Sequence, residues 1–213
     1  MGNGIHTATN VSNALTCLKN QGKTFIGRYF AVTNTWKALT ANEAQKISSA
    51  GLYILSIWED GPANSPNYFT YNQGKLDGDN AFNYAADLEQ SADTPIYFAV
   101  DFDATTTQKQ SILDYFKGIN DGYLQYIYER QKAGEQVVHY KIGVYGSYDV
   151  LTWCKDQGIA TYFFQAYAPG WSSGRNANPW SGYHLRQTAS NQTLCSINLD
   201  LDISNDAAGG WKL

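Results

Sequence analysis

Short apolar runs alternate with amphipathic stretches along most of this chain. Five amphipathic stretches have helical spacing, at about 10–20, 41–50, 75–91, 106–133 and 147–157. Eight apolar runs have the length and residue types of strands, near Gly4–His6, Thr24–Phe30, Leu52–Trp58, Pro95–Asp103, Lys141–Gly146, Tyr162–Tyr167, Tyr183–Thr188 and Leu199–Ile203.

Two of the expected helices have clear ends. The second begins with the capping-box pattern Thr40-x-x-Glu43 and stops at Gly51. The fourth ends at Gly134, and its apolar positions recur at helical spacing: Ile112, Phe116, Ile119, Tyr123 and Ile127.

Alternating strands and helices predict a parallel sheet, and eight strands favour its closure into an α/β barrel of the (β/α)8 TIM type. Segment 170–182 has the composition of a loop, so we expect helices to be missing from the C-terminal third of the barrel. An open doubly wound sheet is the alternative, although no Gly-rich phosphate loop follows the first strand. Since no repeat or linker interrupts the 213 residues, we expect a single domain, 1–213.

The fourth strand is apolar until its C-terminal end, where Asp101 and Asp103 appear. Alternation puts both on one face with Tyr97 and Ala99, turned toward the barrel axis. Catalytic groups of such barrels gather at the C-terminal ends of strands, so this face predicts an acidic site at the barrel mouth. Asp103 has a structural alternative, which is to cap the helix that follows.

The last strand is also acidic, with Asp200 and Asp202 on one face and leucines on the other. Closing the barrel brings this strand beside the first, so Asp101, Asp103 and Asp200 should converge over one cavity. Acid/base cleavage of a glycosidic bond needs two carboxyl groups, one protonated and one charged, and crowding of like charges raises one pKa. We therefore expect Asp101, Asp103 and Asp200 to be catalytic; a divalent metal bound through oxygen is the alternative.

Other side chains at strand ends or in adjoining loops are candidates for holding a sugar. They are His6, Arg28, Trp58, Glu59, Tyr145, Gln165, Tyr167, Trp171, Gln187 and Asp202. A lone histidine such as His6 is more often structural. Of Arg28 and Tyr29, one should face the cavity. Glu59 is out of phase with Ser56 and Trp58, so alternation turns it away from the axis.

The loop 170–182 carries Trp171 and Trp180, which would either stack on sugar rings or pin the loop down. The aromatic share of 15% suits carbohydrate binding and core filling alike.

Charge and hydropathy exclude several partners. The net charge is −4 and no Lys/Arg run occurs, so we expect no nucleic-acid binding. No run of 18 apolar residues is present, so we expect no membrane span. No Cys/His spacing predicts zinc, so we expect no metal and no other cofactor. We expect a monomer.

The three cysteines, Cys17, Cys154 and Cys195, are far apart and odd in number. They predict no disulfide framework, so we expect buried free thiols. Met1–Gly4 lacks the basic and apolar regions of a secretory signal, which leaves the localisation open.

Four segments together resemble a glycoside-hydrolase-like barrel family, domain of unknown function 1906, and more distantly the family 25 lysozymes. The segments are Gly4-Ile5-His6, Gly22–Phe30, Asn42–Leu52 and Ile96–Asp103. The resemblance covers nearly the whole chain. It implies a barrel that acts on bacterial cell-wall glycan, outside the cell or in its wall.

Carried over residue by residue, the lysozyme pattern assigns three acids. Asp101 matches the first acid of the fourth strand, Asp200 the last-strand acid, and Asp103 the proton-donating glutamate, one methylene shorter. His6 takes the place of the first-strand aspartate and cannot supply its negative charge. The resemblance therefore implies the fold more strongly than the activity.

Three functions follow as hypotheses. The first is a lysozyme-like hydrolase with Asp103 as proton donor, Asp101 as charge stabiliser or orienter, and Asp200 as a supporting carboxylate. The second is a degenerate barrel that binds cell-wall carbohydrate or peptidoglycan without cutting it. The third is a metal-dependent hydrolase that uses His6 and the aspartates.

Overall fold

The computed structural model describes residues 2–205 and 208–213, and its strands close into a barrel in chain order. This confirms the expected TIM-type fold. The strands are β1 (Gly2–Thr7), β2 (Phe25–Phe30), β3 (Tyr53–Trp58), β4 (Pro95–Ala99), β5 (Lys141–Gly146), β6 (Tyr162–Gln165), β7 (Leu185–Leu194) and β8 (Ile197–Ser204).

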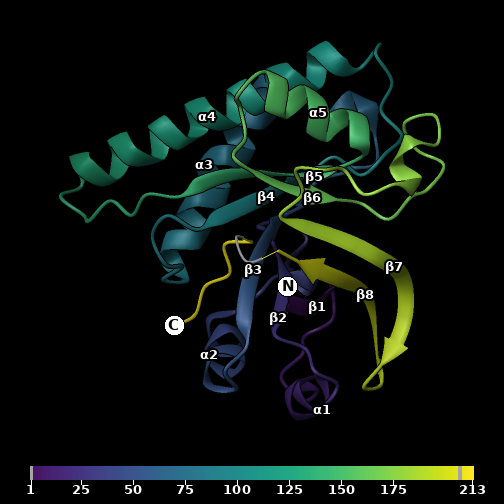
Figure 1. Ribbon diagram of the computed structural model, residues 1–213. Coiled ribbons are helices and arrows are strands. Elements are labelled where there is room, and N and C mark those ends of the chain that lie inside the picture. The colour runs from purple at the N-terminus through teal and green to yellow at the C-terminus, as the bar shows by residue number, and fades with distance from the viewer. Residues whose placement is uncertain (1, 206–207) are drawn as a thin grey trace.

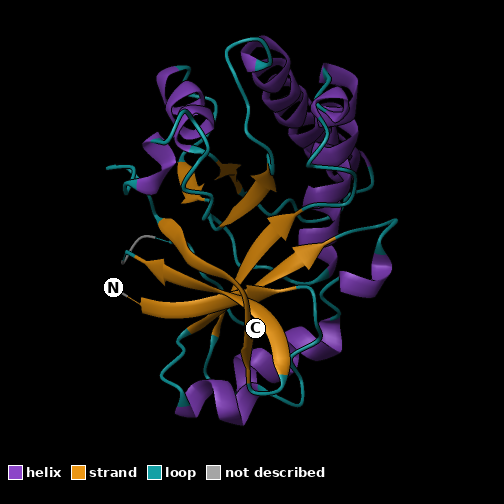
Figure 2. Ribbon diagram, turned by 90° about the vertical axis from the view of Figure 1, so that its right-hand side faces the viewer, coloured by secondary structure: helices purple, strands orange, loops and turns teal. Residues whose placement is uncertain are grey.

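Among the described residues, five α-helices lie outside the strands (Figure 2). In Figure 1, α3, α4 and α5 cover one side of the barrel, and α1 and α2 lie on the opposite side. Between β6 and β7 the only helical turn described is the 3₁₀ turn Arg175–Ala177, which confirms the missing helices of the C-terminal third. The helices are α1 (Leu15–Asn20), α2 (Ala41–Ser49), α3 (Tyr71–Asp87), α4 (Lys109–Lys132) and α5 (Tyr148–Asp156). Within the described ranges, none has the length and apolar character needed to cross a bilayer.

The expectation of a wholly parallel sheet is wrong at β8. Strands β1 to β7 pair in parallel, whereas β8 is antiparallel to both β7 and β1. The reversal occurs at Cys195 and Ser196, the two residues between the paired Leu194 and Ile197. Their φ angles of 53° and 63° are those of a two-residue turn whose twist matches a hairpin. The chain therefore turns back directly, without a crossover helix.

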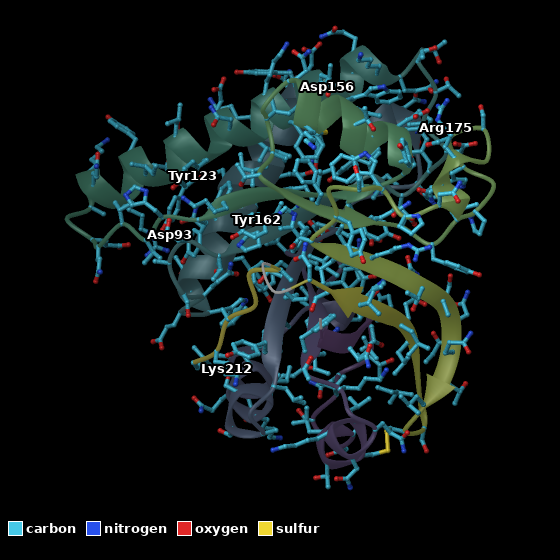
Figure 3. All side chains as sticks on the ribbon, in the orientation of Figure 1. Asp93, Tyr123, Asp156, Tyr162, Arg175 and Lys212 are labelled. Carbon is cyan, nitrogen blue, oxygen red and sulfur yellow. A yellow bond between two sulfur atoms is a disulfide. The ribbon has the colours of Figure 1, made fainter. Side chains whose placement is uncertain are left out.

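Two of the three cysteines form a disulfide, so the expectation of free thiols is wrong for this pair. Cys17 in α1 is bonded to Cys195 at the β7–β8 turn, across a sequence separation of 178 residues. Figure 3 shows the sulfur–sulfur bond at the end of this hairpin. The pairing of β8 with β1 brings the hairpin next to the segment that follows β1. Cys154 is free and buried, as expected.

The helix α2 begins where the capping pattern predicts, but its glutamate has another task. The Glu43 N–H donates to the Thr40 side chain at 3.3 Å. The Glu43 carboxylate instead accepts hydrogen bonds from Arg28 of β2 and from the Val11 N–H. This buried ion pair fixes α2 against the outer face of the barrel.

Candidate functional site

A cavity of about 240 Å³ opens at the C-terminal ends of the parallel strands. We call it the central cavity. Its charged lining residues come from four different strand ends: His6, Glu59, Asp101 and Asp200. The other lining residues are Tyr29, Ile57, Ala99, Tyr145, Ala166, Tyr167, Ala168, Trp171, Gln187, Ser190 and Asn191. Carboxyl groups of β3, β4 and β8 therefore meet over one hollow.

His6 lies between two carboxylates of β8. Its Nε2 is 3.0 Å from Asp200 Oδ2, and its Nδ1 is 2.8 Å from Asp202 Oδ2. Burial alone would lower the pKa of His6, but the charge of Asp202 and the hydrogen bonds to both aspartates raise it to about 10. The imidazole is therefore a cation at neutral pH, and it donates one hydrogen bond to Asp200 and one to Asp202.

Asp200 is held at both of its carboxylate oxygens. Oδ2 accepts from His6, and Oδ1 accepts from the Asn191 N–H at 2.7 Å. Asn191 adopts φ 54° where the β7–β8 pairing changes register between Ala189 and Gln192, and this irregularity aims its N–H at the carboxylate. Burial would raise the pKa of Asp200, but His6 holds it below the ordinary value. Asp200 is therefore an oriented, ionised carboxylate.

Asp101 faces the same cavity from the end of β4. Burial raises its pKa, the charge of Glu59 adds to that rise, and the positive charge of His6 offsets only part of it. The Asp101 N–H donates to the Ala63 carbonyl at 2.8 Å, which fixes the backbone after the strand has ended. Asp101 therefore keeps its proton up to a higher pH than Asp200 does.

Glu59 corrects our expectation about the phase of β3. The inner face of β3 carries Leu55 and Ile57, so Glu59 points into the cavity. Ser56 and Trp58 belong to the outer face, where Trp58 is buried in the core beneath the helices. The Glu59 carboxylate pairs with Lys37 Nζ at 3.0 Å.

On the side of the cavity formed by β5, β6 and β7, hydrogen bonds between uncharged groups connect the lining residues. The Tyr145 hydroxyl donates to Gln187 Oε1 at 3.0 Å, and the Tyr167 N–H donates to the same oxygen at 3.0 Å. Gln187 thereby joins β5, β7 and the segment after β6. Tyr145, Tyr167, Gln187 and Trp171 all line the cavity, and their expected contact with a sugar stays a prediction.

Asp103 lies apart from the central cavity. The strand ends at Ala99, so the alternation that holds for Tyr97, Ala99 and Asp101 does not extend to Asp103. Its side chain is exposed, and Oδ1 accepts from the Ser172 N–H at 2.8 Å. Asp103 therefore anchors the loop that carries Trp171, and the geometry gives no support to its expected role as proton donor.

Other expected sugar-binding residues are buried in structural roles. Arg28 is on the outer face of β2, paired with Glu43, so Tyr29 is the residue that faces the cavity. Gln165 is buried, and its amide donates to Asn178 O and Asn176 Oδ1 of the following loop. Asp202 lies beneath the cavity, 3% exposed, and touches it only through His6.

Trp180 is also part of the core, where its indole N–H donates to Thr152 Oγ1. It therefore pins the loop, which was one of the two expected roles.

Two polar residues of the cavity lining escaped the sequence analysis. Ser190 and Asn191 belong to the part of β7 that extends beyond the expected strand. Only the register irregularity turns them toward the cavity, and no sequence signal predicts it. The described residues include no group of three or more His, Cys, Asp or Glu side chains arranged to hold a metal ion.

The sequence matches proteins of related description. The family Rv2525c-like, glycoside hydrolase-like domain, matches residues 16–207. Protein FadG of Bacillus subtilis is 30% identical over 205 residues, which is 91% of this chain. This chain spans about a third of the length of FadG, 32%.

The barrel is also similar to solved structures. The Mycobacterium tuberculosis Tat-secreted protein Rv2525c, in complex with L-tartrate, matches 99% of this chain and 98% of its own, with TM-score 0.79 and 18% identity. The autolysin LytC of Streptococcus pneumoniae, in complex with a synthetic peptidoglycan ligand, matches 94% of this chain and 46% of its own, with TM-score 0.55 and 13% identity.

A family GH25 lysozyme of Aspergillus fumigatus matches 96% of this chain and 95% of its own, with TM-score 0.50 and 13% identity. These likenesses extend over the whole barrel, and they establish a shared fold. With the family match over residues 16–207, they identify this chain as a member of the Rv2525c-like, glycoside hydrolase-like domain family.

Proposed function

We propose that this domain is a glycoside hydrolase that cuts the glycan of the bacterial cell wall, with Asp101 as the proton donor and Asp200 as the charged carboxylate. One observation carries the proposal: the two carboxyl groups line one cavity, and their surroundings shift their pKa values in opposite directions. A pair of titratable groups separated in this way is the usual arrangement for acid/base work.

Each group would act at one stage of bond cleavage. Asp101 gives its proton to the glycosidic oxygen, so the leaving sugar departs as a neutral alcohol. Positive charge then develops on the anomeric carbon, and ionised Asp200 stabilises it. A water molecule adds to that carbon and gives a proton back to Asp101, which completes the hydrolysis. His6 and the Asn191 N–H keep Asp200 oriented and charged during this step. Burial raises the pKa of Asp101, and the charge of Glu59 adds to that rise.

The substrate class comes from similarity and from the cavity lining. The structural neighbour LytC was solved with a peptidoglycan ligand, which makes peptidoglycan the first substrate to test. Aromatic and amide side chains in the lining, such as Trp171 and Gln187, suit the faces and hydroxyls of sugar rings.

Three aspartate variants test the proposal with purified peptidoglycan. Asp101→Asn and Asp200→Asn should each lower the release of new reducing ends by about a hundredfold or more, since general acid catalysis alone supplies that much. Asp103→Asn is the matched control and should keep its activity, because an asparagine Oδ1 still accepts from the Ser172 N–H.

The thermal midpoints of Asp101→Asn and Asp103→Asn should stay close to that of the wild type, whereas Asp200→Asn removes a charged partner of His6 and should lower the midpoint, so its activity is measured well below that temperature. Undiminished cleavage by Asp101→Asn, or equal loss in Asp103→Asn, would contradict these roles.

The second candidate is a barrel that binds wall glycan without cutting it. The observation in its favour is His6, a cation directly on Asp200, which reduces the negative charge that Asp200 offers to an oxocarbenium ion. This candidate predicts that wild-type protein binds peptidoglycan and releases no reducing ends in long incubation. A metal-dependent hydrolase, the third hypothesis, predicts that a chelator abolishes cleavage.

A further inference from the structure

Two further hollows adjoin the central cavity and share its walls. The first, of about 560 Å³, contains Glu59 and Asp101 together with residues of the β2–α2 and β3–α3 loops. The second, of about 310 Å³, contains Tyr29 and Asp200 together with residues after β1 and on the hairpin. We call them the loop-side hollow and the hairpin-side hollow. Both are larger than the central cavity of about 240 Å³, so space for a ligand continues past the carboxylates in two directions.

Trp36 lines both of these hollows and does not line the central cavity. Its side chain is 74% exposed, the largest exposed fraction among the exposed large apolar residues of the described chain. A single exposed apolar residue is common on protein surfaces and means little alone. Here the indole stands between two polar hollows that both open onto the candidate catalytic carboxylates.

The segment that carries Trp36 is held on both sides. On one side, Asp60 Oδ1 accepts hydrogen bonds from the Val32, Thr33 and Asn34 N–H groups, at 3.1, 2.8 and 2.9 Å. On the other side, Lys37 is only 7% exposed and is paired with Glu59. The segment is therefore fixed before any ligand arrives, so a ligand on Trp36 loses little free energy to loop ordering.

Polar residues line both hollows beside Trp36. The loop-side hollow contains the amide side chains of Asn34 and Asn64, and the hairpin-side hollow contains Thr9 and Asn198. A flat aromatic face with amide and hydroxyl groups beside it suits a pyranose, which has an apolar face of C–H groups and a rim of hydroxyls.

We propose that Trp36 is the stacking platform of a sugar subsite outside the central cavity, and that the ligand is a glycan chain several rings long. The proposal rests on the proposed function and deepens it, because it specifies how many sugar rings the ligand must have to fill the whole site. A disaccharide can fill the central cavity without reaching Trp36. A longer chain extends into the neighbouring hollow and gains the stacking contact.

Binding of two chitin fragments by titration calorimetry tests the proposal. The ligands are the dimer and the hexamer of N-acetylglucosamine, and every protein carries Asp101→Asn so that the ligand stays uncut. Adding Trp36→Ala should weaken hexamer binding by about tenfold and dimer binding by less than about twofold. Trp36→Phe, which keeps a smaller ring, should be intermediate for the hexamer.

Tyr128→Ala is the matched control, since Tyr128 is 58% exposed on α4 and contributes to none of the three hollows. It should leave both affinities unchanged. Unaltered hexamer binding by the Trp36→Ala protein overturns the inference, and so does an equal loss for dimer and hexamer. Absence of binding by the parent protein overturns both the inference and the choice of amino-sugar ligand.

The two proposals fail in different ways. If Trp36→Ala weakens hexamer binding selectively while the wild type releases no reducing ends, the subsite stands and the hydrolase proposal falls.

Discussion

At the scale of single residues, the site depends on which carboxyl groups keep a proton. His6 is charged because two aspartates surround it, and its charge in turn keeps Asp200 ionised. Asp101 lies in the same cavity but is buried beside Glu59, so its pKa moves upward. The opposite shifts have different causes: burial raises the pKa of Asp101, whereas His6 lowers that of Asp200, and this contrast assigns the roles of acid and charged carboxylate.

These shifts predict the pH profile of cleavage. The active species has Asp101 protonated and Asp200 ionised, so activity falls as pH drops through the lowered pKa of Asp200. It also falls as pH rises through the raised pKa of Asp101. Glu59→Gln removes one cause of the rise at Asp101, so the alkaline limb of kcat/KM should move to lower pH while the acidic limb stays. A profile with an unmoved alkaline limb in this variant would remove Asp101 from the role of acid.

Residue-level expectations succeeded where the strand pairing continued and failed where it stopped. Alternation correctly put Asp101 inward because Tyr97 and Ala99 precede it on a regular strand. The same rule failed for Asp103, because the pairing of this segment with β5 stops at the Val100 N–H, which donates to the Tyr145 carbonyl, and the chain has left the sheet by Asp103. Glu59 was misassigned because a tryptophan was expected inside the barrel, whereas Trp58 packs beneath the helices.

At the scale of elements, the β7–β8 hairpin distinguishes this barrel from a regular one. It replaces the final helix and supplies Asn191 and Asp200 to the central cavity. Its turn is bonded to α1 through Cys17 and Cys195. Bonds of this kind persist in oxidising surroundings, which agrees with a substrate in the cell wall.

Reduction of this disulfide should loosen the hairpin. We expect a reductant to lower the free energy of unfolding by about 5 kcal/mol, mainly because the unfolded chain gains freedom across a loop of 178 residues. Urea unfolding with and without dithiothreitol measures the change. The control is the double variant Cys17→Ser, Cys195→Ser. Its free energy of unfolding should equal that of the reduced wild type and should not change with dithiothreitol, because its remaining cysteine, Cys154, is a free thiol. A reductant effect of equal size in this double variant would assign the change to another cause.

Helix positions followed from apolar spacing, but the starts of two helices did not. The helix α1 begins at Leu15, whereas we expected a helix from about residue 10. The N-cap of α3 is Thr70, whereas we expected the helix from residue 75, because Gly74 and Gly78 weaken the helical pattern. In the structure these glycines let α3 approach α4 closely: a Cβ on Gly74 would lie 1.9 Å from the Tyr115 carbonyl oxygen. The β7–β8 turn was missed because Cys-Ser is not a typical hairpin sequence.

At the scale of the whole molecule, the ring of strands closes between β1 and β8, where one histidine contacts two aspartates. The pairing of β1 with β8 completes the ring of strands, and His6 binds two carboxylates of β8 across this seam. The barrel itself followed from the count and order of the strands. The polar seam could not be predicted, because it depends on the antiparallel direction of β8, which sets Asp200 opposite His6.

Closure through a charged histidine makes the stability of the fold depend on pH. The pKa of His6 is about 10 in the folded protein and 6.5 in an ordinary setting. The contribution of His6 is therefore complete below pH 6.5 and is lost as pH rises toward 10. From pH 6.5 to 8.5 the free energy of unfolding should fall by on the order of 2 kcal/mol. Urea unfolding at several pH values measures this slope.

His6→Gln provides the comparison, because glutamine donates a hydrogen bond but takes up no proton in this range. The variant should be less stable at pH 6.5, and its stability should change little up to pH 8.5. Should it fail to fold, carbon-13 NMR of the wild-type imidazoles gives the same information. The His6 ring should remain protonated at pH 8.5, whereas His184, whose pKa is lowered by burial, should be neutral well below that pH. A His6 signal that titrates near pH 6.5 would mean that the seam is neutral, and it would also remove the positive charge that keeps Asp200 ionised.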